Sequence, residues 1–266
     1  MFATLTSELR EMAQEQVQFR ELLLQMTLRD LRLRYKQTIM GFGWAIFMPL
    51  VNTAVFSVIF TRVAPLDTGM PYPLFAYCGL LTWNFSAAAF RFAVTSLTGN
   101  GNLVTKVYFP REILPISSVI VSFVDFLVGS LVLVALIAYY RVPPTWMLMV
   151  LPVVMIVHIS FTIAVAMILA MANLFYRDVK YLFEIILTVW MFSTSVLYPM
   201  SLVGGKMGRV LALNPMTPII DGYRNVLVRG VAPDPSFGWT SGVTLVVLII
   251  AWLCFHRAEF RFAENI

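Results

Sequence analysis

The sequence predicts an all-α, polytopic membrane protein with six transmembrane helices, an N-terminal amphipathic interface helix and short external helices. Of its 266 residues, 59% are hydrophobic and only 12% are charged, whereas a soluble domain carries about 25% charged residues. The apolar residues gather in runs of roughly the 20 residues that a membrane-spanning helix needs. Basic residues lie between these runs, as they do at the flanks of membrane helices. The surplus apolar surface is therefore expected to face lipid.

Six runs are expected to span the membrane, within a transmembrane domain of residues 39–256. They are residues 39–61, 72–97, 113–140, 146–174, 181–199 and 239–255. The third and fourth are long enough to tilt or protrude, and the last has only 17 residues. Residues 1–38 precede the domain, and residues 257–266 form a tail.

The basic residues also predict the orientation. Of the 19 Lys and Arg residues, twelve fall on the side of the N-terminal segment, six on the other side, and Arg91 within a span. The more basic side of a membrane protein is usually cytoplasmic, so both termini are expected in the cytoplasm. The net charge of +5 is explained by these flanks and does not indicate nucleic-acid binding.

The cysteines and histidines predict neither a disulfide nor a metal site. Cys78 and Cys254 are expected in different helices near opposite membrane faces, too far apart to be bridged. No C-x-x-C motif or histidine cluster occurs. The first 38 residues are polar and helix-like, and so do not resemble a secretory signal.

The N-terminal segment carries one apolar stripe beside a basic face. The stripe has i, i+3, i+4, i+7 spacing and consists of Phe19, Leu22, Leu23 and Met26. Such a helix suits the cytoplasmic membrane interface, an interpretation favoured because the segment continues directly into the first span. The alternative is a cytoplasmic helix that packs on the protein itself.

The cytoplasmic loop Thr98–Glu112 predicts one short helix. Gly99 and Gly101 interrupt the preceding helix, and Pro110 ends the new one. The loop carries several apolar and aromatic residues that need burial: Leu103, Val104, Val107, Tyr108 and Phe109. They either pack against neighbouring helix ends or dock into a cytosolic partner, and composition alone favours neither.

The external segment 200–238 is the longest loop and is expected to contain two short helices. One begins at Thr217 and Pro218 and is closed by Gly230. The other covers Met207–Leu213. These helices are equally suited to form a lid at a membrane exit or a cap over helix ends.

Four ionisable residues fall within the expected spans, where such groups are costly. Arg91 lies close enough to the cytoplasmic end of its span to snorkel, and Glu184 is a candidate partner for it. Asp125 and His158 lie near mid-membrane on consecutive spans. A hydrogen-bonded structural pair is expected there rather than a proton relay, because one pair cannot cross the bilayer.

Aromatic residues make up 14% of the chain. Flat aromatic faces with nearby hydroxyls suit the passage of sugar rings, which present apolar C–H faces and polar rims. In the fifth span, Trp190, Ser193 and Thr194 are expected on one helical face with Tyr198 at its edge. The alternative, of nearly equal weight, places Tyr198 in the interfacial belt and Trp190 between helices.

Several catalytic motifs are absent from the sequence. No phosphate-binding G-x-x-x-x-G-K-[ST] loop occurs, since Gly205–Lys206 lacks the upstream glycine. No nucleophile–base set or carboxylate pair lies at a membrane face either. The chain is therefore not expected to be an enzyme or to hydrolyse ATP alone. Six spans are few for a stand-alone transporter with internal repeats, so a homodimer is expected.

The chain resembles the permease subunits of ABC exporters for cell-surface polysaccharides, the O-antigen, capsule and teichoic-acid type. The resemblance covers nearly the whole chain and is strongest for the O-antigen branch. It rests on LRDLRLRYKQTIMGFGWAIFMPL (28–50), PYPLFAYCGLLTWNF (71–85), NLVTKVYFPREILP (102–115), VDF (124–126), FYRDVKY (175–181) and ALNPMTPIIDGYR (212–224). Arg91 departs from the family, in which small polar residues are usual at this place.

The resemblance implies an inner-membrane exporter of a lipid-linked polysaccharide, with a homodimeric channel and a separate ATP-binding subunit that binds the ATP. The N-terminal helix would lie near the substrate's entrance among membrane lipids, and the external helices would gate the exit. The coupling helix would use Asn102, Leu103, Lys106, Val107, Tyr108, Phe109 and Arg111. The channel candidates are Trp44, Phe47, Trp83, Phe85, Phe90, Arg91, Trp190, Ser193, Thr194 and Tyr198.

Two other functions are considered beside this one. A permease for a capsule, a teichoic acid, a small lipid or a drug would belong to the same superfamily. A membrane-embedded enzyme acting on a lipid-linked sugar would need clustered acid and base residues at one face, and the sequence lacks them.

Overall fold

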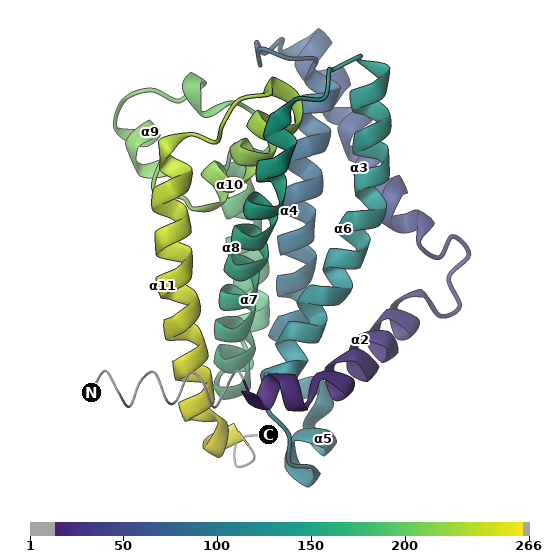
Figure 1. The fold of residues 1–266 in the computed structure, drawn as a ribbon, viewed down its shortest axis with the longest axis vertical. Helices are drawn as coiled ribbons and strands as arrows, with labels where there is room; N and C mark the ends of the chain where they lie inside the picture. The colour runs from purple at the N-terminus through teal and green to yellow at the C-terminus, as the bar shows by residue number, and fades with distance from the viewer. Residues whose placement is uncertain (1–13, 263–266) are drawn as a thin grey trace.

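The computed structural model describes residues 14–262, and all regular secondary structure in that range is helical (Figure 1). The all-α prediction is therefore confirmed for this part of the chain. The α-helices are α2 Arg20–Tyr35, α3 Gly43–Val58, α4 Tyr72–Val94, α5 Gly101–Lys106, α6 Ile113–Tyr139, α7 Leu151–Phe175, α8 Val179–Phe192, α9 Gly205–Leu211, α10 Met216–Arg224 and α11 Pro235–Ala258.

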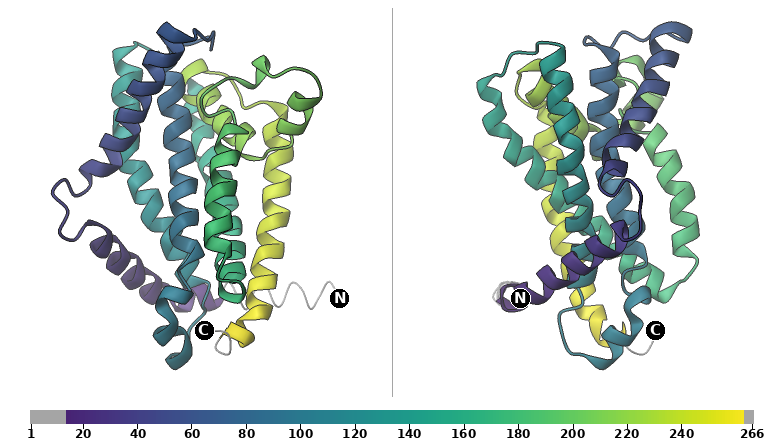
Figure 2. Two further views of the ribbon diagram at one scale, coloured as in Figure 1. Left: turned by 180° about the vertical axis from the view of Figure 1, so that it is seen from behind. Right: turned by 90° about the vertical axis from the view of Figure 1, so that its right-hand side faces the viewer.

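The long helices form one bundle. Helices α4, α6, α7 and α11 run side by side, and the other elements lie around them (Figures 1 and 2). The short helix α5 lies at one end, which we call the α5 end, and α9 lies at the other, the α9 end. Helix α2 slants across the lower part of α6, while α3 accompanies its upper part.

Four helical segments are long enough, and have a high enough mean hydropathy, to cross a membrane. They are Gly43–Val63, Ile113–Tyr139, Trp146–Phe175 and Pro235–Arg261. Helix α4 has 23 residues but includes Thr82, Asn84 and Arg91, which lower its mean hydropathy. Helix α8 has only 14 residues. Four of the six expected spans are thus both long enough and apolar enough to cross a membrane.

The apolar stripe of α2 packs on the protein itself. Met26 is buried in a cluster at the α5 end together with Leu97 and Phe109, and the rest of the stripe lies against the same cluster. This packing supports the alternative in which α2 covers its own bundle. Leu24 and Leu28, which lie one turn apart, remain exposed on α2.

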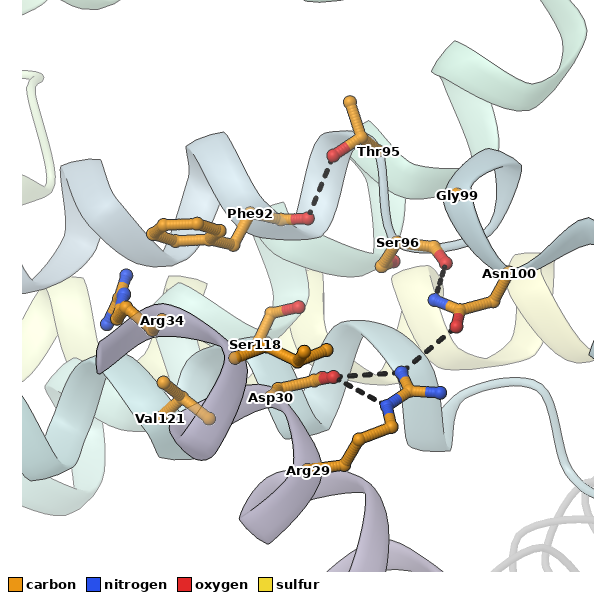
Figure 3. A pocket seen from close by; sticks show the side chains of 11 residues that line it. Arg29, Asp30, Arg34, Phe92, Thr95, Ser96, Gly99, Asn100, Ser118 and Val121 are labelled. Carbon is orange, nitrogen blue, oxygen red and sulfur yellow. Dashed lines mark hydrogen bonds and ion pairs between the residues drawn. The ribbon is translucent and has the colours of Figure 1, made fainter. Parts of the chain in front are cut away.

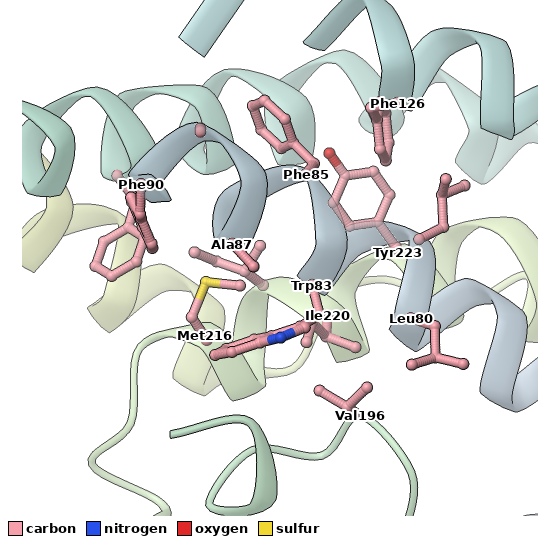
Figure 4. Close-up of a cluster of buried hydrophobic side chains, with 14 of the residues drawn as sticks. Leu80, Trp83, Phe85, Ala87, Phe90, Phe126, Val196, Met216, Ile220 and Tyr223 are labelled. Carbon is pink, nitrogen blue, oxygen red and sulfur yellow. The ribbon is translucent and has the colours of Figure 1, made fainter. Parts of the chain in front are cut away.

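Helix α4 forms the centre of the main core. Most of its side chains are buried, because α3, α6, α7, α8 and α10 all pack against it. Figure 4 shows α4 aromatics enclosed by Phe126, Met216 and Tyr223 from other helices.

The predicted continuous helix over residues 181–199 is wrong, because α8 ends at Phe192. The hydroxyls of Ser193 and Thr194 donate to the carbonyls of Val189 and Trp190, a local bond that competes with helix continuation. Asn214 Nδ2 donates to the Ser193 carbonyl at 2.9 Å. The chain turns away after this point, so the expected helical face over Trp190, Ser193 and Thr194 does not form.

Helix α10 begins at Met216 and continues as a π-helix to Arg229. Gly230 then adopts φ +67°, as expected of the residue that closes a helix. A Cβ at Gly230 would lie 2.6 Å from Thr145 Cγ2, so a side chain there would also clash. The apolar face of α10 is buried in the main core, as a cap would be.

Candidate functional site

A cavity of about 500 Å³ opens between α2, α4 and α6 near the α5 end (Figure 3). Arg29 Nη2 donates to Asp30 Oδ1 at 2.8 Å and to Asn100 Oδ1 at 3.0 Å. Ser117 on α6 donates to the other oxygen of Asp30 at 3.1 Å. These bonds connect α2 to α6 and to the turn that follows α4. The cavity therefore has a polar floor beside apolar walls such as Phe92 and Val121.

A second cavity of about 330 Å³ lies between α3, α4 and α6, and its lining includes Trp44, Phe85, Arg91 and Asp125. Asp125 accepts hydrogen bonds from Arg34 and from the Tyr35 hydroxyl. Burial, with a further contribution from Asp125, raises the pKa of Tyr35. Arg34 also lines the first cavity, so its ion pair with Asp125 stands between the two. The two cavities together follow α4 and α6 into the bundle.

The predicted hydrogen bond between Asp125 and His158 is wrong. The Asp125 carboxylate instead accepts hydrogen bonds from Arg34 and Tyr35 on α2. His158 is fully buried, and its ring nitrogens lie 2.8 Å from Ser86 Oγ and 3.3 Å from the Tyr223 hydroxyl. Helix α2 supplies the partners of Asp125, and α4 and α10 supply those of His158.

The predicted partner of Arg91 is present. Arg91 Nε donates to Glu184 Oε1 at 3.0 Å, and both side chains are about half exposed. The pair joins α4 to α8 at a surface that also borders the second cavity.

The aromatic channel candidates divide into enclosed and exposed residues. Trp83 and Phe90 are buried in the core of the chain (Figure 4), and their assignment to a channel between two copies stays a prediction. Trp190 stacks on Phe90, with ring centroids 5.9 Å apart, and donates to Asn214 at 2.9 Å. This packing agrees with the alternative prediction, in which Trp190 lies between helices.

The remaining channel candidates differ in how exposed they are. Thr194 is buried, and Phe85 is buried but borders the second cavity. Tyr198 is half-buried and donates to the Phe192 carbonyl. Trp44 and Phe47 are exposed on α3.

The predicted coupling segment is only partly available to a partner. Helix α5 ends at Lys106 rather than at Phe109. Tyr108 is 79% exposed and Val107 is exposed, but Phe109 is 1% exposed within the cluster at the α5 end. Phe109 thus packs against residues of its own chain such as Leu97 and Val104, and its predicted docking role stays a prediction.

Arg111 is likewise engaged inside the chain. Its Nη1 donates to Glu259 Oε1 and its Nη2 to the Val104 carbonyl, both at 3.2 Å. The guanidinium thus connects α5 to the end of α11, and its predicted contact with a partner stays a prediction. Asn102, Lys106 and Tyr108 remain exposed.

Sequence reasoning missed a buried arginine at the α9 end. Arg224 is fully buried and donates to the carbonyls of Phe75 at 3.1 Å and Val196 at 2.8 Å, and to that of Ser195. Its fourth partner is Asp221 Oδ1 at 2.9 Å. The spacing of Asp221 and Arg224, one helical turn apart within DGYR, was the available signal. This arginine fixes α10 to α4 and to the turn after α8.

A cluster of titratable groups at the α5 end was also missed. Glu112, His256 and Glu259 place one ligand atom each within 4.8 Å of one another. Glu112 is 1% exposed. Burial, strengthened by the nearby Glu259 carboxylate, raises the pKa of Glu112. The residues lie far apart in the sequence, so no spacing rule could have joined them.

Long apolar helices define a multi-pass membrane protein, and two cavities lined by apolar and polar side chains lie along α4 and α6. Residues 21–228 match the model of the ABC-2 type transporter family. The chain is 31% identical to the O-antigen export system permease protein RfbA of Myxococcus xanthus over 96% of this chain and 99% of the relative. It is 27% identical to a protein of the same name from Klebsiella pneumoniae, over 92% and 94% of the two chains. The chain belongs to the ABC-2 type transporter family.

Proposed function

We propose that this chain is the permease subunit of an ABC exporter that moves a lipid-linked cell-surface polysaccharide of the O-antigen type. The observation that carries the proposal is the match along almost the full length of a relative named for O-antigen export. The cavity path along α4 and α6 supports it, because apolar walls beside polar groups suit an amphipathic ligand.

The substrate path would begin in the cavity beneath α2 and continue along α3. Leu24 and Leu28 give α2 an apolar outer side, so the helix would lie at the membrane interface beside arriving lipid. Trp44 and Phe47 are exposed on α3, where they would offer flat faces to sugar rings. A small lipid or drug is the second candidate substrate, since the first cavity alone is about 500 Å³.

ATP would be hydrolysed by a separate ATP-binding subunit, the partner that membership of this family implies. Val107 and Tyr108 at the α5 end are the exposed apolar residues next to α5, and they would contact that subunit. The α5 end and both termini would then be cytoplasmic, and the membrane would be the inner one. Two copies would form the channel, with exposed apolar residues of α3 and α8 facing either the second copy or lipid.

A deletion of this chain in its native host tests the function. Cells without it should lose surface polysaccharide and accumulate lipid-linked glycan on the cytoplasmic side, as measured by antibody labelling before and after permeabilisation. Trp44→Ala should lower surface polysaccharide with normal amounts of protein. Trp146→Ala is the matched control, because Trp146 is also exposed but borders neither cavity. Unchanged surface polysaccharide in the deletion strain would refute the proposal.

A further inference from the structure

We propose that Glu112, His256 and Glu259 form a binding site for a divalent transition-metal ion, best fitted by Zn²⁺. This site lies at the α5 end, apart from the cavities assigned to the substrate, and does not depend on the proposed function. Glu112 caps the start of α6, and the other two residues end α11. The sequence alone predicted no metal site, because its two histidines are far apart.

The distances between the ligand atoms suit a tetrahedral ion. His256 Nδ1 lies 3.3 Å from Glu112 Oε1 and 3.7 Å from Glu259 Oε2. Zn–O and Zn–N bonds of about 2.0–2.2 Å place tetrahedral ligand atoms about 3.3–3.6 Å apart. The largest separation in the cluster is at most 4.8 Å, which a small rotation of one carboxylate closes.

The carboxylate of Glu112 points to a missing ligand. The residue is 1% exposed, and its Oε2 has no hydrogen-bond partner in the described part of the chain. A buried carboxylate oxygen without a partner is costly. A cation held by Glu112 would satisfy it.

The second carboxylate is already oriented toward the same point. Glu259 Oε1 accepts from the Arg111 backbone N–H at 3.1 Å and from Arg111 Nη1 at 3.2 Å, which leaves Oε2 facing His256. Partners of this kind fix metal ligands in the required orientation.

The mixed ligand set indicates the class of ion. Two carboxylates and one imidazole suit zinc and similar first-row ions, whereas Mg²⁺ prefers oxygen and water ligands. The ion would take the lone pair of His256 Nδ1, and any proton on that nitrogen would pass to solvent. The bound ion would join the start of α6 to the end of α11, next to the Arg111 bridge to α5.

The test uses the full chain, purified without a histidine tag, stripped with a chelator and dialysed against Zn²⁺. We expect one Zn²⁺ per chain, retained in millimolar Mg²⁺, and a rise in the thermal unfolding midpoint. Glu112→Gln and His256→Gln should each lower Zn²⁺ affinity more than about 100-fold, beyond the loss typical of a partner that only orients a ligand. Glu21→Gln removes an exposed carboxylate on α2 and should change nothing.

Co²⁺ provides an independent readout that does not need a folded variant. The wild-type chain should show the d–d absorption of tetrahedral Co²⁺ without a thiolate charge-transfer band, because the nearby Cys254 is not a ligand in this proposal. Cys254→Ser should keep both the spectrum and the affinity. Absence of stoichiometric Zn²⁺ binding by the wild type would overturn the site, as would wild-type affinity in both ligand variants.

Discussion

The two ends of the bundle hold their buried charges in different ways. At the α9 end, the Arg224 guanidinium donates to three backbone carbonyls and one carboxylate, and it is fully buried. Toward the α5 end, charges pair between side chains, Arg34 with Asp125 and Arg111 with Glu259, although Arg111 also donates to two backbone carbonyls. Those pairs join separate helices and remain partly exposed.

The difference indicates which end can change shape. Backbone carbonyls at fixed positions hold Arg224 in one arrangement, because any shift of α10 would leave a buried charge without partners. Ion pairs between flexible side chains can persist while α2 moves along α6. We therefore expect motion at the α5 end, near the proposed partner contact, and a fixed arrangement at the α9 end.

Removal of the Arg224 side chain should have the largest effect. Arg224→Ala leaves Asp221 and three carbonyls without their donor, and we expect a loss of about 3–5 kcal/mol in the free energy of unfolding. Arg224→Lys should recover little of it, since an ammonium group cannot reproduce the fork geometry. Denaturant unfolding of the purified chain measures both. Equal stability of wild type and Arg224→Ala would remove the contrast between the ends.

Phe109 and Tyr108 should separate stability from partner binding. Phe109→Ala opens a cavity in the cluster at the α5 end and should cost about 3–5 kcal/mol. Tyr108→Ala removes an exposed ring and should stay within about 0.5 kcal/mol of wild type, while lowering copurification of the ATP-binding subunit. Thermal unfolding and pull-down yield are the measurements. Full partner recovery with Tyr108→Ala would contradict the assigned contact.

Asp125 should couple to α2 and not to His158. Asp125→Leu leaves the Arg34 and Tyr35 donors without their acceptor and should cost about 1–3 kcal/mol, whereas Asp125→Asn keeps one acceptor oxygen and should cost less. In double-mutant cycles, Asp125→Asn should interact with Tyr35→Phe. With His158→Gln its effect should be additive within about 0.5 kcal/mol. A strong coupling to His158 would restore the pair that the structure excludes.

The half-exposed Arg91–Glu184 pair should matter least to stability. Exposed ion pairs contribute about 0–1 kcal/mol, so Arg91→Gln should leave the unfolding midpoint nearly unchanged. Surface polysaccharide in the complemented deletion strain is the more sensitive readout, because Arg91 borders the second cavity. Exchange of the two charges, as Arg91→Glu with Glu184→Arg, tests whether the pair or the arginine itself is needed. Loss of stability beyond about 2 kcal/mol in Arg91→Gln would show a structural role.

The sequence by itself determined the helical class and the approximate position of each long helix. Apolar runs identify Ile113–Tyr139 almost to the residue, because a helix in lipid must satisfy its own backbone. Local rules also found the Gly230 helix end and the Arg91–Glu184 pair. In each case the deciding interaction is local, or needs only two charges at similar depth on helices whose direction is known.

Only the tertiary structure decided which side chains are enclosed and which polar groups meet. Phe109 and Tyr108 are adjacent and alike in composition, yet one is buried and the other exposed because of where Leu97 and Met26 lie. The end of α8 at Phe192 depends on Asn214, more than 20 residues later. Asp125 pairs with α2 and Arg224 with α4 for the same physical reason. A buried polar group takes whichever partner the packing of the helices brings within reach, and that packing is not written in local spacing.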